Sequence, residues 1–106
     1  MFASLPKTAQ AFIEWTWGEI EPYYLDLEAR PLDADNVAAW LADWTLLQQL
    51  MSESGARLHV ATTVNTSDQE AVTRYQNFLV HIAEPAAPHE QKLREKLLAS
   101  GLSLSG

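Results

Sequence analysis

The sequence predicts an all-α protein, an antiparallel up-down bundle of about four helices in a single domain over residues 1–106. Apolar residues recur at spacings of three and four nearly throughout, which is the period of a helix with one buried face. The stretches are separated by short turn sequences, which place neighbouring helices antiparallel. The one β-branched cluster, Leu58–Val64, continues a helical stripe and would have no partner strand, so we expect it to be helical.

The first part of the chain contains two helix starts. Pro6 suits the first position of a short helix. The capping-box spacing Thr16-x-x-Glu19 starts a second helix at Trp17. Pro22 falls inside this helix and is expected to bend or loosen it, because proline has no backbone N–H to donate. Pro31 ends it, since the residue before a proline disfavours helical geometry.

The next helix is long and contacted on more than one side. Asp33 is a good N-cap for it. Gly55 weakens a helix by about 1 kcal/mol relative to alanine. We expect the helix to pass through Gly55 towards Val64, with a break at 54–56 as the alternative. Its apolar stripe is Val37, Trp40, Trp44, Leu47, Met51 and Leu58.

The last part of the chain predicts two further helices. Residues 65–68 form a turn, and Ser67-x-x-Glu70 again has capping-box spacing. The two prolines in Glu84–Pro88 predict a kink or a stop between the helices. Ser100-Gly101 is a C-terminal stop, and residues 102–106 are expected to be a frayed tail. Glu90 and Arg94 are expected to pair at i,i+4 on the last helix.

Charge and composition narrow the classes of partner. The formal net charge is −7, with 7 basic and 14 acidic residues, which disfavours a nucleic-acid footprint. No apolar run approaches the ~18 residues of a membrane span, so no membrane partner is expected. The chain has no cysteine, which excludes disulfides and fits a reducing compartment. No secretory signal is visible at the N-terminus, and we expect a cytoplasmic protein.

Motifs for catalysis or metal binding are lacking, so no catalytic residue, metal ligand or cofactor is predicted within this chain. The three histidines are His59, His81 and His89. His89-Glu90 begins like the zinc-binding His-Glu-x-x-His pattern, but Leu93 stands where the second histidine belongs. An autonomous small enzyme or metal protein stays as a third hypothesis, which binding of Zn²⁺ at micromolar affinity would revive.

The acidic half of the chain carries all four tryptophans. Residues 1–55 have 2 basic and 9 acidic side chains, whereas residues 56–106 have 5 of each. The aromatic residues have two interpretations, a core that uses tryptophan or an acidic interaction surface for a partner. The candidate surface residues are Trp15, Trp17, Tyr23, Tyr24, Trp40 and Trp44.

Six short stretches follow one another in a distinctive order between about residues 12 and 102. They are Thr16–Tyr24, Arg30–Leu32, Val37–Trp44, Ala56–Leu58, Asp68–Tyr75 and Lys96–Ser100. Together they resemble the N-terminal region of oligoendopeptidase F-type enzymes, in the thimet-oligopeptidase-like family of zinc metallopeptidases. The matching stretches belong to the scaffold of that family rather than to its catalytic machinery.

The resemblance implies a non-catalytic helical lobe that forms part of the wall of a peptide-substrate channel. Members of the family are mostly cytoplasmic hydrolases that cleave short peptides with one zinc ion. That zinc is held by a His-Glu-x-x-His helix and a further glutamate in the C-terminal half. None of that part is present here, so no catalytic residue carries over, zinc is expected only in the absent catalytic domain, and the isolated chain is not expected to be an enzyme.

Two functional hypotheses therefore stand side by side. In the first, the chain is the N-terminal part of a peptidase, either a fragment or a relative that has lost the rest, and its partner is the catalytic domain. Its exposed apolar surface would then make the isolated chain a homo-oligomer. In the second, the chain is a stand-alone helical interaction module that binds a partner through its acidic, Trp-rich face.

Overall fold

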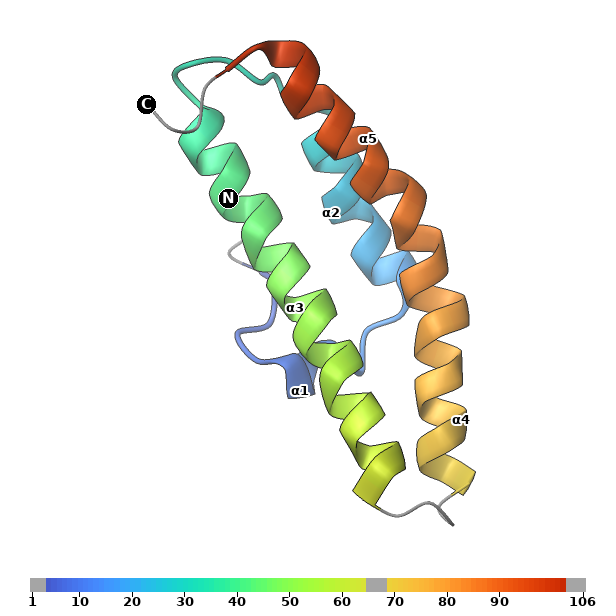
Figure 1. Ribbon diagram of the computed structural model, residues 1–106. Coiled ribbons are helices and arrows are strands. Elements are labelled where there is room, and N and C mark those ends of the chain that lie inside the picture. Colours follow the sequence, from blue (N-terminus) through green and yellow to red (C-terminus); the bar gives the residue numbers. More distant parts are fainter. Residues whose placement is uncertain (1–3, 65–68, 103–106) are drawn as a thin grey trace.

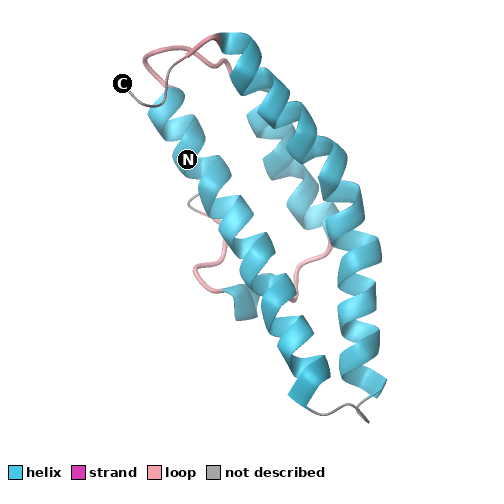
Figure 2. Cartoon of the chain, viewed as in Figure 1, coloured by secondary structure: helices cyan, strands magenta, loops and turns pink. Residues whose placement is uncertain are grey.

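The computed structural model describes residues 4–64 and 69–102, and all of its regular elements are helical (Figures 1 and 2). The prediction of an all-α bundle is confirmed. No strand occurs among these residues, and Leu58–Val64 is helical as expected. The elements are α1 (Ala9–Phe12), α2 (Trp17–Ala29), α3 (Val37–Val64), α4 (Gln69–Phe78), the π-helical turn η1 (Leu79–Ala83) and α5 (Glu84–Ser100).

The long helix α3 lies beside the continuous helix formed by α4, η1 and α5, and the two run in opposite directions (Figure 1). Helix α2 packs against α5 and the first half of α3, whereas the short α1 packs against α3 further along. The core lies where these elements meet. Its buried large side chains are Phe12, Ile20, Tyr24, Leu27, Trp40, Trp44, Leu47, Leu50, Ile82 and Leu93.

The predicted helix boundaries around α2 are confirmed. Thr16 and Glu19 form the predicted capping box, in which the Glu19 carboxylate accepts a hydrogen bond from the Thr16 amide at 3.1 Å. The Thr16 hydroxyl also donates to this carboxylate at 3.2 Å. Helix α2 passes through Pro22 and ends at Ala29, and Arg30, before Pro31, is extended. Asp33 then accepts the amides of the turn that leads into α3.

Helix α3 is continuous through Gly55, so the break at 54–56 does not occur. A Cβ atom at Gly55 would lie 3.3 Å from the ring of Phe78 in α4. The glycine therefore lets the aromatic ring approach the backbone of α3. Gly101 has φ 69° and ends α5 in the left-handed conformation, as the stop at Ser100-Gly101 predicts. The predicted turn and cap at 65–68, and residues 103–106 of the expected frayed tail, lie outside the described residues.

The predicted stop at Glu84–Pro88 does not occur, because the chain stays helical from Gln69 to Ser100, although α5 is tilted relative to α4 (Figure 1). The wide turn η1 immediately precedes this segment, and the Glu84 N–H donates to the carbonyl of Leu79, five residues back. In a regular α-helix the ring of Pro85 would press on the carbonyl four residues before it. A π-helical turn widens the backbone at that point, so Pro85 is accommodated without ending the helix.

Candidate functional site

Half of the candidate surface residues lie in the core. Trp40 and Tyr24 have no exposed area, and Trp44 is 6% exposed. This corrects the surface prediction for these three residues. Trp40 meets Trp44 edge-on, with ring centroids 5.3 Å apart, and its indole N–H donates to the carbonyl of Leu27 at 3.0 Å. These indoles are structural because the core of so small a bundle is filled by large side chains.

The other candidates, Trp15, Trp17 and Tyr23, are half-buried. Trp15 stacks on Phe12 and contacts Tyr23, with centroid distances of 5.9 and 5.8 Å. Trp17 contacts the rings of Tyr24 and His89 at 5.8 and 5.6 Å. Each of these residues therefore has one side in the bundle and another that reaches the surface, which is the arrangement of an aromatic group available to a partner.

Trp15 and Trp17 border a surface groove, which we call the Trp15 groove. It has a volume of about 600 Å³ and lies between residues 13–17 and the stretch from Arg74 to Pro85, with Leu58 of α3 also in its wall. The η1 residues Val80 and His81 line it. Wide π-helical turns occur frequently at functional sites, because they displace side chains from the regular helical surface.

The walls of the Trp15 groove are aromatic and charged. Its aromatic wall includes Phe78 besides the two tryptophans. Arg74 and Glu14 approach each other at 3.6 Å across it, with both side chains more than half exposed, so their attraction is largely screened by water. Within the described residues, no group of three or more His, Cys, Asp or Glu side chains could hold a metal ion.

His89 lies in a second polar and aromatic cluster between α2 and α5. Its ring is 5.5 Å from that of Tyr24, and its Nδ1 is 3.2 Å from both carboxylate oxygens of Glu28. The side chains of His89 and Glu90, which begin like a zinc-binding motif in the sequence, point in different directions in the structure. The His89 ring faces α2, and Glu90 faces α3 as well as α2.

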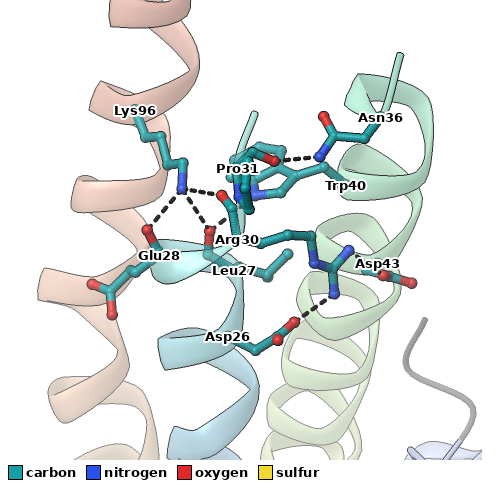
Figure 3. Close-up of polar contacts among 9 residues, drawn as sticks. All are labelled: Asp26, Leu27, Glu28, Arg30, Pro31, Asn36, Trp40, Asp43 and Lys96. Carbon is teal, nitrogen blue, oxygen red and sulfur yellow. Dashed lines mark hydrogen bonds and ion pairs between the residues drawn. The ribbon is translucent and has the colours of Figure 1, made fainter. Parts of the chain in front are cut away.

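A polar network joins the top of α2 to α3 and α5 (Figure 3). Arg30 bonds the buried Asp43 carboxylate at 2.7 Å and the exposed Asp26 carboxylate at 2.5 Å. Burial alone would lower the pKa of Arg30, but its hydrogen bonds to Asp43 and Asp26 raise that pKa. Lys96 donates to the carbonyls of Leu27, Glu28 and Arg30 at 3.2, 2.7 and 2.5 Å, which satisfies the open C-terminal end of α2.

Glu90 is the residue that sequence reasoning missed. The sequence predicts an i,i+4 pair of Glu90 with Arg94, but the Glu90 carboxylate accepts hydrogen bonds from Tyr24, Trp44 and Gln48. Burial and the neighbouring Glu90 carboxylate raise the pKa of the Tyr24 phenol, which therefore remains a hydrogen-bond donor. The positions of Ala86 and Leu93, both buried and on the same helix face as Glu90, could have located it.

No helix among residues 4–64 and 69–102 is long and apolar enough to cross a bilayer. Comparisons with protein-family models, curated proteins and solved structures find no match to this chain.

Proposed function

We propose that this chain is a non-catalytic helical lobe of a larger, cytoplasmic zinc peptidase of the oligoendopeptidase F type. In this proposal it packs against the catalytic domain and forms part of the wall of the channel that admits short peptides. The zinc ion and its ligands belong to the catalytic domain, and the lobe hydrolyses nothing by itself.

The roles of the motif residues carry this proposal. The stretches that resemble the peptidase family supply Arg30, Trp40, Asp43 and Trp44, and these side chains lie buried or half-buried in one connected set of contacts. Lys96, from the last of these stretches, donates to the carbonyl of Arg30 (Figure 3). Scaffold residues are expected to behave in this way, because they hold helices together rather than face a substrate.

Exposed apolar side chains near the end of α3 and in η1 support the same proposal. Val60 is 55% exposed and Val64 is 79% exposed at the end of α3, and Val80 is 51% exposed in η1. Val80 also lines the Trp15 groove. Apolar surface that borders an aromatic groove is typical of a site that another protein surface covers.

The experiment compares the isolated chain with the product of the complete reading frame. We expect zinc-dependent hydrolysis of a short fluorogenic peptide by the complete product and none by the isolated chain. Acrylamide should quench the fluorescence of Trp15 and Trp17 in the isolated chain more strongly than in the complete product. Equal quenching in both, or no peptide hydrolysis by the complete product, would contradict the proposal.

The Trp15 groove also favours a second candidate, a stand-alone helical interaction module. In either case the isolated chain has an uncovered surface, and we propose that it associates with a second copy of itself. Sedimentation velocity from micromolar to millimolar concentration should show a dimer or larger species. Replacing Val80 with aspartate should shift that equilibrium to monomer, whereas aspartate at the exposed Ala99 should leave it unchanged.

A further inference from the structure

A second groove lies between α3 and α5. We call it the Glu90 groove. It has a volume of about 390 Å³ and is lined by Met51 of α3, Phe78 of α4, and Ala83, Ala86, Ala87 and Glu90 from η1 and α5. Ala83, Ala86, Ala87 and Glu90 line the same side of the groove, since Ala86 and Ala87 are each three or four residues from both Ala83 and Glu90. The three small side chains open an apolar path between the helices towards the carboxylate.

The Glu90 carboxylate is held in position by neutral donors. The Tyr24 hydroxyl donates to one of its oxygens at 3.0 Å. The Trp44 indole N–H and the Gln48 amide donate to the other at 2.6 and 3.4 Å. None of these groups carries a positive charge, so the carboxylate is oriented but not neutralised.

No cation offsets this charge in the described part of the chain. The ion pairs there are formed by Arg30, Arg74, His89 and Lys92, and all of them involve other carboxylates. A carboxylate has about four acceptor sites, of which three are used here. One site therefore remains for a cationic donor that enters along the apolar path.

We propose that the Glu90 groove binds the side chain of a lysine from a protein partner, with the ammonium on Glu90 and the alkyl chain on Met51 and the alanines. A primary ammonium fits better than a guanidinium, because arginine binds a carboxylate best through two parallel bonds to two free oxygens. Both oxygens of Glu90 already accept a hydrogen bond. The net charge of −7 favours encounter with a basic partner segment. This inference does not depend on the peptidase proposal.

The test uses Nα-acetyl-lysine N-methylamide as the probe and the indole N–H signals as the readout, in two-dimensional NMR. The Trp44 indole N–H touches the carboxylate, so its signal should shift saturably with the lysine probe. The Trp40 signal serves as the internal reference, because that indole bonds the Leu27 carbonyl. The uncharged norleucine probe and the arginine probe should bind at least tenfold more weakly.

Two variants make the test independent of folding defects. Glu90→Gln keeps the shape of the side chain and should weaken lysine binding at least tenfold. Ala87→Leu keeps the carboxylate but fills the groove, and should weaken binding similarly, whereas Ala99→Leu, at an exposed position of α5, should bind like the parent. The proposal is overturned if the lysine probe gives no saturable shift, if Ala87→Leu binds normally, or if free n-butylammonium binds and the lysine probe does not.

Discussion

Replacing Trp40 with alanine tests whether the Trp-rich segment is core or surface. Trp40 has no exposed area, meets Trp44 edge-on, and donates its indole N–H to the carbonyl of Leu27. Truncation of a buried tryptophan to alanine costs about 3–5 kcal/mol. A domain of this size has a free energy of unfolding of about 5–15 kcal/mol, so Trp40→Ala should remove a third or more of it in most of that range.

A second variant separates packing from hydrogen bonding. Trp40→Phe keeps most of the ring contacts and loses the indole N–H. The Leu27 carbonyl would still accept a bond from Lys96 at 3.2 Å and would not be left unsatisfied. The cost of Trp40→Phe should therefore be only about 1–2 kcal/mol. Trp17→Ala, at a half-buried position, is the matched control and should cost less than half as much as Trp40→Ala.

Unfolding in urea is monitored by circular dichroism at 222 nm. Thermal unfolding is measured in a separate experiment. A loss of 3 kcal/mol or more in the free energy of unfolding corresponds to a fall in Tm of at least about 12 °C. If Trp40→Ala lowers the free energy of unfolding by less than about 1 kcal/mol and leaves the helix content unchanged, the assignment of Trp40 to the core is refuted.

Three further changes probe the polar contacts that join the helices. Lys96→Met removes three charge-assisted bonds to the end of α2 and should cost about 1.5–3 kcal/mol in urea unfolding, whereas Lys92→Met, at a side chain 65% exposed, should cost less than about 0.5 kcal/mol. Asp43→Asn removes the buried carboxylate that pairs with Arg30 and should cost about 3 kcal/mol in urea unfolding. This value is near the lower end of the range for breaking a buried ion pair, because Arg30 keeps its ion pair with Asp26. The raised pKa of Tyr24 means that the folded state keeps a proton that the unfolded state releases above about pH 10. Stability should therefore fall as pH rises above 10, and unfolding of Tyr24→Phe should lose this part of the pH dependence.

Local signals predicted most of the helix boundaries. The capping box at Thr16-x-x-Glu19, the proline after Arg30 and the left-handed Gly101 each act through one or two neighbouring residues. Their effect on the backbone can therefore be worked out from sequence alone. The 3–4 spacing of apolar residues identified the core faces of α3 for the same reason.

Two features were not predicted from the sequence because they depend on other parts of the structure: the helix through Pro85 and the contacts of Glu90. The cost of Pro85 in a helix is local, but the wide turn η1 that removes it has no marker in the apolar pattern. The contacts of Glu90 between the helices were not predicted, because a periodicity of apolar residues ignores acidic ones. Its three donors come from α2 and α3, and only the fold brings them together.

The composition also could not decide which aromatic residues face outward. Trp15 and Trp17 lie in the same acidic half as Trp40 and Trp44, yet the first pair borders a groove and the second fills the core. The two pairs differ in exposure because they lie at different places in the helices. Trp15 precedes α2 and Trp17 is its first residue, whereas Trp40 and Trp44 lie one helical turn apart on the buried face of α3.

The central claim is that this bundle is a lobe of a larger zinc peptidase, and the most direct measurement is the sequence of the reading frame beyond codon 106. We expect the frame to continue without interruption and to encode a His-Glu-x-x-His helix with a further glutamate after it. A stop codon directly after codon 106, in the gene as it occurs in its source, would contradict the account. The Trp15 groove would then become the binding surface of an independent helical module.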